Sequence, residues 1–211
     1  MTITNLNKFI FSVFISLTIF CFIQPTQVFA SSLDNAIFAG GCFWCLEHDL
    51  ESLNGVINVD SGYTGGDLVN PTYKNHQGHQ ESVFVTFDPM KINYNSLLRS
   101  YWRNVDPLDE EGQFCDKGDS YIPIIFFNNS SQETMALDSL DKAVKELGQE
   151  PPNIKVQVLP SMRFWLAEDY HQDFAERNSI KYNFYRYSCG RDKRLDEIWG
   201  PSARTDDEWK Q

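Results

Sequence analysis

The sequence predicts an α+β fold, a split β-α-β (ferredoxin-like) mixed sheet with helices packed on it and a long irregular C-terminal tail. Two observations predict this class. Strand-like and helix-like periodicities follow one another as strand, helix, strand, strand, helix, strand, and then helix, strand, helix. The first six segments have the order of the split β-α-β motif, whose helices lie on one face of the sheet. No internal repeat or low-complexity segment interrupts them.

Residues 1–30 have the composition of a cleaved signal peptide. Lys8 precedes an apolar run from Phe9 to Ile23, and small residues at Val28 and Ala30 fit the cleavage rule. The run is too short to favour spanning a bilayer. We therefore expect a signal peptide over 1–30 and a single domain over 31–211. The protein should be exported, periplasmic in a Gram-negative host and otherwise secreted, without stable membrane association after cleavage.

The charge balance excludes some partners. Acidic residues number 29 and basic residues 18. Nucleic acid is therefore not an expected partner, because phosphate binding needs cationic surface. Four of the five cysteines follow residue 30, and an even number suits disulfides in an oxidising compartment.

The first half of the domain supplies five elements. Strands are predicted by alternating or short apolar runs, and the helices by apolar residues at helical spacing. Asn54-Gly55 ends the first helix and Asn93 caps the second. The predicted elements are strand Asn35–Ala39, helix Phe43–Leu53, strands Val56–Tyr63 and Glu81–Asp88, and a helix from Asn93 through Trp102.

The second half supplies four more elements and the tail. The longest helix starts at Ser130, keeps a stripe from Ala136 to Leu147, and is closed by Pro151-Pro152. The tail from Ile180 to Gln211 is rich in aromatic residues but has no clear period. The other predicted elements are strands Tyr121–Phe127 and Ile154–Leu159 and a helix from Glu168 to about Asn178.

Gly40-Gly41-Cys42-Phe43-Trp44-Cys45 is the most informative stretch. Cys42 is predicted to open a helix, where unpartnered N–H groups and the macrodipole favour an anion by about 0.3 to 1 kcal/mol. We therefore expect the pKa of this thiol, ordinarily ~8.5, to be lowered. Cys45 completes a C-x-x-C spacing that indicates redox chemistry rather than a buried apolar thiol.

A second informative region lies in the loops that follow. It comprises Gly62-Tyr63-Thr64-Gly65-Gly66, Asn70-Pro71-Thr72-Tyr73 and Gly78-His79-Gln80-Glu81. Gly and Asn-Pro make tight turns, and sites are commonly built where loops meet the ends of elements. On composition alone, Tyr63 and Tyr73 could equally be packing residues.

Together these segments resemble the A-type peptide methionine sulfoxide reductases. Asp88-Pro89 and Ala167-Glu168-Asp169-Tyr170-His171-Gln172 complete six matching segments, which occur in the family's order and cover most of residues 36–200. The resemblance implies an oxidoreductase that repairs oxidised proteins under oxidative stress. It reduces methionine S-sulfoxide, free or in proteins, through a cysteine sulfenic acid and a disulfide.

The resemblance also implies roles for individual residues. Cys42 attacks the sulfoxide sulfur, and Glu81 protonates its oxygen, which requires a poorly solvated carboxyl group. Phe43 and Trp44 hold the substrate's ε-methyl group. The residues that hydrogen-bond the oxygen or order nearby water are Tyr73, Tyr121 and Asp116, although Asp116 could equally be a turn residue.

A second thiol must condense with the sulfenic acid of Cys42 before further oxidation. We favour Cys189, which lies on the tail. Cys45 is nearer in sequence, but a spacing of three residues at a helix start gives cramped disulfide geometry. Cys115, beside a predicted pocket residue, is the third candidate. Cys45 also departs from the family, in which this position is often Gly.

Three other interpretations compete. His76, His79 and Glu81 with a nearby cysteine could bind a metal. Cys42 and Cys45 could form a general thiol-disulfide exchanger, and the aromatic residues could form a peptide-binding cleft without turnover. His171 is predicted to be a structural histidine rather than a catalytic base.

We expect an enzyme with no metal and no organic cofactor. Its expected partners are oxidised proteins or free methionine sulfoxide, and a thioredoxin-like reductant. We expect the protein to be a monomer.

Overall fold

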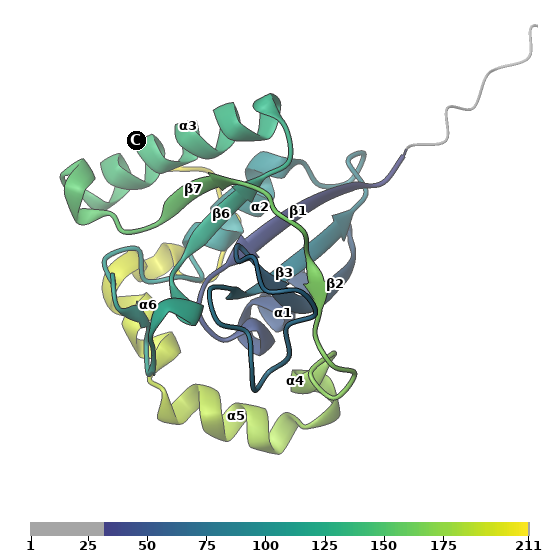
Figure 1. Cartoon of the computed structure of the whole chain (residues 1–211). Coiled ribbons are helices and arrows are strands. Elements are labelled where there is room, and N and C mark those ends of the chain that lie inside the picture. The colour runs from purple at the N-terminus through teal and green to yellow at the C-terminus, as the bar shows by residue number, and fades with distance from the viewer. Residues whose placement is uncertain (1–31, 211) are drawn as a thin grey trace, which may run out of the picture. The chain divides into compact units, whose positions relative to one another are not determined.

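A six-stranded mixed sheet forms the centre of the computed structural model, which describes residues 32–210 (Figure 1). The order is β7-β6-β1-β3-β2-β8. Its central strands pair antiparallel: β1 (Asp34–Ala39), β2 (Val56–Thr64), β3 (Gln80–Phe87) and β6 (Ile124–Phe127). The order β6-β1-β3-β2 is that of the split β-α-β motif, so the predicted α+β class is confirmed. The predicted signal peptide, 1–30, lies outside the described residues.

Two short strands extend this sheet. β7 (Gln157–Pro160) pairs parallel with β6, and β8 (Trp165–Leu166) pairs antiparallel with β2. A parallel pair needs a crossover connection, which α3 (Ser130–Leu147) supplies between β6 and β7. β7 starts later than the predicted Ile154. A 3₁₀ turn over Pro151–Asn153 precedes this residue, and the N–H of Lys155 donates to the carbonyl of Pro107, which is outside the sheet.

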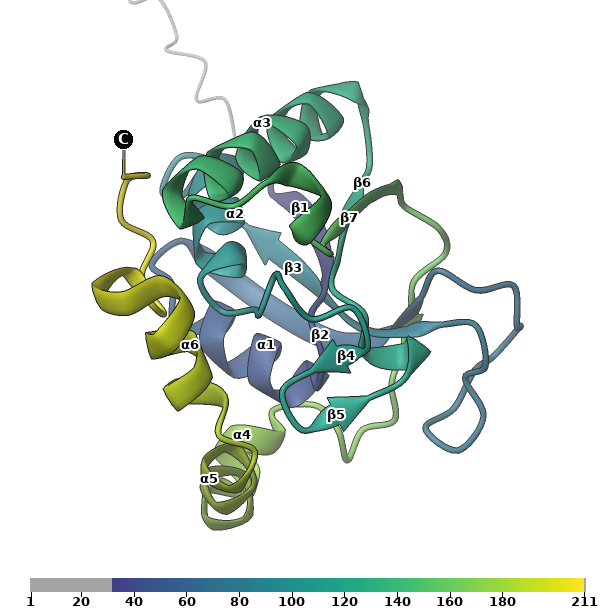
Figure 2. The same ribbon diagram turned by 90° about the vertical axis from the view of Figure 1, so that its left-hand side faces the viewer.

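The main core lies between the sheet and α1 (Phe43–Glu51), α2 (Tyr94–Trp102) and α3. Phe38 of β1 stacks on Tyr101 of α2 with ring centroids 4.9 Å apart. The indole N–H of Trp102 donates to the hydroxyl of Ser139, 2.9 Å away, and so joins α2 to α3. Figure 2 shows these three helices on one side of the sheet. The predicted cap of α2 is confirmed, since Asn93 accepts from the N–H of Ser96.

The tail is helical, so the prediction that it is irregular is wrong. It contains α5 (Ser179–Ser188) and α6 (Arg191–Trp199). Their periodicity is weak because apolar side chains of α5 face solvent and α6 is mostly charged. The side chains of Ile180, Phe184 and Tyr187 are 88, 74 and 87% exposed. Helical residues that leave their apolar side chains in water give no amphipathic pattern.

Two further elements have boundaries that differ from the predictions, and one strand pair was not predicted. The predicted strand Tyr121–Phe127 begins only at Ile124, since a 3₁₀ turn over Asp119–Tyr121 and then Pro123 precede it. Within the predicted helix Glu168–Asn178, only α4 (Phe174–Arg177) is α-helical, because left-handed backbone at Asp173 separates it from the preceding turns. A small antiparallel pair, β4 (Gly112–Gln113) and β5 (Asp116–Lys117), was not predicted (Figure 2).

No helix within 32–210 combines the length and apolar composition that crossing a membrane requires.

A buried ion pair ties the last residues of the chain to the core. Arg103 and Glu146 have side chains 0 and 4% exposed, with an N–O distance of 3.2 Å. Arg103 also donates to the carbonyl of Glu208 and the hydroxyl of Thr205. Breaking one partner of such a pair costs about 3–5 kcal/mol, because the remaining charge stays buried.

We therefore expect Arg103→Met to lower the free energy of unfolding by about 3–5 kcal/mol in urea titrations. The double variant Arg103→Met with Glu146→Leu should recover much of this loss, because no unpaired charge remains. If the single variant is as stable as the parent protein, the pair does not hold the C-terminal segment.

Candidate active site

Cys42 occupies the turn between β1 and α1, at the N-cap of the helix. Two glycines make this turn possible. Gly41 has a φ of +81°, and a Cβ there would lie 2.5 Å from the Cβ of Gln113. A Cβ on Gly40 would lie 2.7 Å from Val105. The sequence therefore needs glycine at both positions to place Cys42 at the helix start.

The sulfur of Cys42 faces a small cavity of about 50 Å³. Its volume suits a group the size of a water molecule or two. Seven of the lining residues are those predicted from the sequence, and Tyr185 of α5 is the eighth. The lining residues are Cys42, Phe43, Trp44, Tyr73, Glu81, Asp116, Tyr121 and Tyr185.

Glu81 enters the cavity from the start of β3. Its side chain is almost fully buried, and one carboxyl oxygen accepts the backbone N–H of Phe43 at 3.2 Å. Burial, with smaller contributions from Asp116 and Cys45, raises the pKa of Glu81 to about 8, although the Phe43 N–H opposes the shift. The carboxyl group is therefore protonated at neutral pH, and it can donate a hydrogen bond or a proton into the cavity.

The predicted lowering of the Cys42 pKa is wrong. The residue is 5% exposed, and burial raises the pKa of the thiol well above its usual value, with further contributions from Cys45 and Glu81. A typical macrodipole contribution of about 0.3 to 1 kcal/mol corresponds to less than one pKa unit. Desolvation of a buried thiolate exceeds that amount. Cys42 therefore holds its proton in the resting protein.

Three tyrosines and an aspartate complete the polar wall. Burial raises the pKa of Tyr73, Tyr121 and Tyr185, so each is a neutral hydroxyl. Tyr185 donates to the carboxylate of Asp116. Burial also raises the pKa of Asp116, although the Tyr185 hydroxyl and Arg191 oppose this. Asp116 is thus a pocket residue and not only a turn residue.

The Glu168 carboxylate positions the loop that carries Tyr73. One oxygen accepts the backbone N–H of Tyr73 at 3.1 Å, and the other accepts the hydroxyl of Tyr63 at 3.0 Å. In the sheet register Tyr63 of β2 pairs with Glu81 of β3. The Glu168 segment and the Tyr63 strand therefore hold two sides of the same pocket.

The apolar wall is fixed by contacts to the Trp44 ring. Trp44 stacks on Phe174, with centroids 3.7 Å apart and planes 8° from parallel. Its indole N–H donates to Nδ1 of His171 at 3.1 Å. His171 is 1% exposed, and burial lowers its pKa, which keeps the ring neutral and able to accept. The prediction that His171 is a structural histidine is confirmed.

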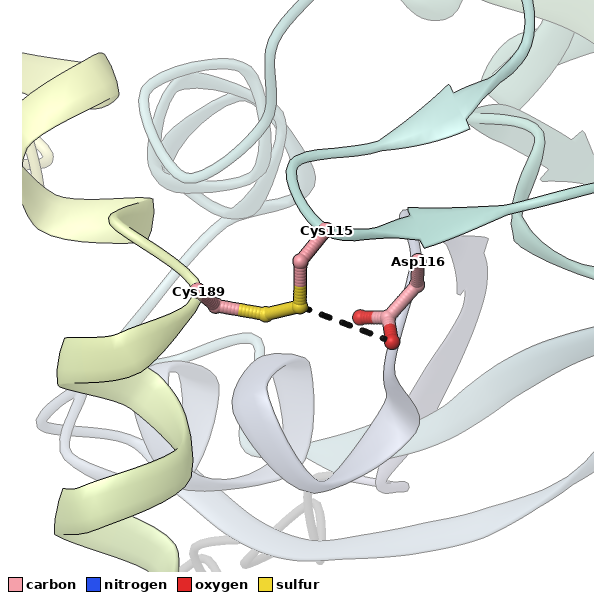
Figure 3. Close-up of side chains that lie close together, drawn as sticks. All are labelled: Cys115, Asp116 and Cys189. Atoms are coloured by element: carbon pink, nitrogen blue, oxygen red, sulfur yellow. Dashed lines mark hydrogen bonds between the residues drawn. A yellow bond between two sulfur atoms is a disulfide. The ribbon is translucent and has the colours of Figure 1, made fainter.

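The four cysteines after residue 30 fall into two pairs. Cys115 and Cys189 form a disulfide with a Cα–Cα distance of 5.0 Å, while Cys42 and Cys45 are free and buried. Figure 3 shows the disulfide between the β4–β5 turn and the end of α5, with Asp116 beside it. Cys189 is therefore not a free thiol in this state. Its N–H donates to the carbonyl of Tyr185 one helical turn earlier, so the disulfide adjoins the cavity wall.

The metal site considered from the sequence does not fit this arrangement. The Nδ1 atom of His79 accepts from the backbone N–H of Gly66, and its Nε2 lies 2.9 Å from the carbonyl of Leu68. His76 bonds the carbonyl of Thr72. Both histidines therefore hold their own loop, and Glu81 faces the cavity of Cys42 instead.

Tyr185 is the pocket residue that the sequence did not reveal. It lies in the tail, where three other aromatic side chains stand within five residues and none marks a face. Only the packing of α5 selects Tyr185. Its position four residues before Cys189 is the one signal that could have singled it out.

Comparison with known proteins gives a consistent picture. The profile of the family described as "Peptide methionine sulfoxide reductase" matches residues 34–203. The "Peptide methionine sulfoxide reductase MsrA 2" of Caulobacter vibrioides is 50% identical over 81% of this chain and 88% of its own.

Two solved structures share the fold. Methionine sulfoxide reductase A of Corynebacterium diphtheriae aligns with a TM-score of 0.65 at 24% identity, over 70% of this chain and 76% of that one. Mxr1 from Saccharomyces cerevisiae in complex with Trx2 aligns with a TM-score of 0.50 at 18% identity, over 69% and 87%.

Proposed function

The chain belongs to the peptide methionine sulfoxide reductase family, and from this premise we propose that it reduces methionine S-sulfoxide, free or in proteins, to methionine. One observation supports the proposal above all. A buried thiol, Cys42, and a carboxyl group that is protonated at neutral pH, Glu81, line one small cavity. Nucleophile and acid are thus held together beside an apolar wall.

The reaction is a two-electron transfer from sulfur to sulfur. The Cys42 sulfur attacks the sulfoxide sulfur while Glu81 gives its proton to the sulfoxide oxygen. This attack forms an S–S bond between Cys42 and the substrate sulfur. The protonated oxygen then moves to Cys42 as a hydroxyl group, the substrate's S–O bond and the new S–S bond break, methionine leaves and Cys42 becomes a sulfenic acid. The proton that the thiol gives up restores Glu81 to its acid form. Sulfur is reduced in the substrate and oxidised in the enzyme.

The apolar and polar walls of the cavity contact different parts of the substrate. Phe43 and Trp44 offer the apolar surface for the ε-methyl group. Tyr73 and Tyr121 are neutral hydroxyl donors that can bond the oxygen as negative charge gathers on it. Tyr185 holds Asp116 in place by its hydrogen bond. The cavity accepts little more than the sulfoxide group and its methyl, which fits recognition of a group common to free and protein-bound methionine.

Regeneration of the Cys42 thiol leaves a disulfide at the protein surface. Cys189 attacks the Cys42 sulfenic acid, which releases water and forms a Cys42–Cys189 disulfide. Cys115 then attacks Cys189, which returns Cys42 to a thiol and leaves the Cys115–Cys189 disulfide. Cys115 is exposed, so a thioredoxin-like reductant can reach this bond. Cys45 is the alternative resolving thiol, since it lies in the same buried pair as Cys42.

General thiol-disulfide exchange by Cys42 and Cys45 is a weaker alternative. The two thiols are only 5 and 1% exposed, so the sulfur of a partner protein cannot approach them in line.

We also propose that the chain is exported and that it repairs oxidised proteins outside the cytosol as a monomer. The composition of residues 1–30, which is that of a signal peptide, supports export.

The proposed activity is tested with the two sulfoxide epimers and dithiothreitol as reductant. We expect the protein to reduce methionine S-sulfoxide and to leave the R epimer unchanged. Cys42→Ser should abolish turnover, because Cys42 is the one thiol among residues 32–210 that lines the cavity. Turnover of the R epimer alone, or full activity of Cys42→Ser, would contradict the proposal.

The raised pKa of Glu81 predicts a pH profile. Glu81 carries its proton below about 8 and loses it above. The kcat/KM for the S-sulfoxide should therefore fall about tenfold per pH unit above that value. Glu81→Gln should lower kcat/KM by a factor of about 10²–10⁴ and should abolish this decrease above pH 8. If kcat/KM of Glu81→Gln still decreases above the same pH, the decrease belongs to another ionisable group.

The proposed order of disulfides, first Cys42–Cys189 and then Cys115–Cys189, is tested by mapping disulfides. The reduced protein is mixed with one equivalent of methionine S-sulfoxide in the absence of a reductant. Cys189→Ser should stop at a sulfenic acid that dimedone traps. Cys115→Ser should stop at a Cys42–Cys189 disulfide, and Cys45→Ser should form Cys115–Cys189 as the parent does. A Cys42–Cys45 disulfide in Cys189→Ser, with turnover retained, would make Cys45 the resolving residue.

A further inference from the structure

A second cluster of ionisable side chains lies at the other end of α1. Glu47 and Glu51 are one turn apart on the same face of the helix, and Asp173 precedes α4. One carboxylate oxygen from each lies within 4.8 Å of the other two. Asp60 and Glu176 add further negative charge to this region. None of these residues lines the cavity of Cys42.

Glu47 is the feature that points to a ligand. It is 1% exposed, and within 32–210 neither of its carboxylate oxygens has a hydrogen-bond partner. The N–H of Asp173 and the hydroxyl of Ser61 come close enough to lower its pKa without completing a bond. The Ser61 hydroxyl is itself buried and without a partner. Leaving such groups unpaired is costly, so something must satisfy them.

Positive charge from the protein does not fill this need. Arg177 lies 3.6 Å from one oxygen of Asp173, but both side chains are about half exposed. No ion pair to Glu47 or Glu51 occurs among the described residues. Burial and the neighbouring acids raise the pKa of Glu47 to about 8 and that of Glu51 to about 7. A cation that contacts all three carboxylates would supply the partner that the Glu47 oxygens lack.

We propose that Glu47, Glu51 and Asp173 bind a divalent cation, Ca²⁺, between α1 and α4. The donor atoms are all oxygen, which selects hard cations over zinc or copper. Calcium tolerates irregular geometry and completes its shell with water, whereas Mg²⁺ demands a near-ideal octahedron. Glu51 also lines a solvent-open cavity of about 530 Å³ together with Glu176 and Tyr182, so this ligand can be reached from solvent.

The ion would stabilise the apolar wall of the active site without contacting the cavity. It joins the last turns of α1 to Asp173, whose neighbour Phe174 stacks on Trp44. Trp44 lies near the start of the same helix. A cation at this cluster therefore holds together the two segments that fix the apolar wall.

The test is calorimetric titration of the chelator-treated full chain with CaCl₂ at pH 7, alongside thermal unfolding with and without the ion. We expect one site with a Kd on the order of 10⁻⁴ M and a higher Tm. These readouts do not depend on reductase activity.

The variants Glu51→Gln and Asp173→Asn each remove one ligand charge. Asparagine tolerates the left-handed backbone of residue 173, so this variant should fold. Each should weaken Ca²⁺ binding by about tenfold or more and lose the Tm shift. Asp141→Asn, an equal charge change at an exposed position of α3, should behave as the parent. No binding up to about 10 mM CaCl₂, or an equal Tm shift in parent and both variants, overturns the proposal.

Discussion

The burial of one thiol and one carboxyl group away from bulk water is the constraint on which the active site of this protein depends. A charge on either would be costly where it lies, so both keep their protons at rest. The helix start that carries Cys42 would by itself favour a thiolate, but its contribution is smaller than the cost of desolvation. The arrival of a polar sulfoxide oxygen, rather than a preformed thiolate, is therefore what sets the proton transfer in motion.

The side chains that bury these two groups come from distant parts of the chain. Glu168 holds the Tyr73 loop and the Tyr63 hydroxyl, and His171 and Phe174 hold Trp44. The C-terminal helices are part of the site, because α5 supplies Tyr185 and ends beside the Cys115–Cys189 disulfide. The same helix thus forms one wall of the cavity and ends at Cys189, the proposed resolving cysteine.

Helix α1 carries different chemistry at its two ends. Its first turn faces an apolar cavity, and its last turns present Glu47 and Glu51 to Asp173. Both ends lie against the segment that runs from Glu168 to Phe174. The position of this one segment therefore affects the Trp44 wall and the acidic cluster together.

The sequence by itself determined the central sheet, the start of α1 at Cys42 and the apolar and polar residues of the pocket. These follow from local periodicity, from glycines that only a tight turn requires, and from motifs that a family shares. The tertiary structure decided what depends on burial and long-range packing. It reversed the expected pKa shift of Cys42, made helices of a tail whose apolar residues face water, and selected Tyr185 from among several aromatic neighbours. It also paired Cys189 with Cys115, because a disulfide across 74 residues depends on where the fold brings two chain segments together, and local sequence does not record that distance.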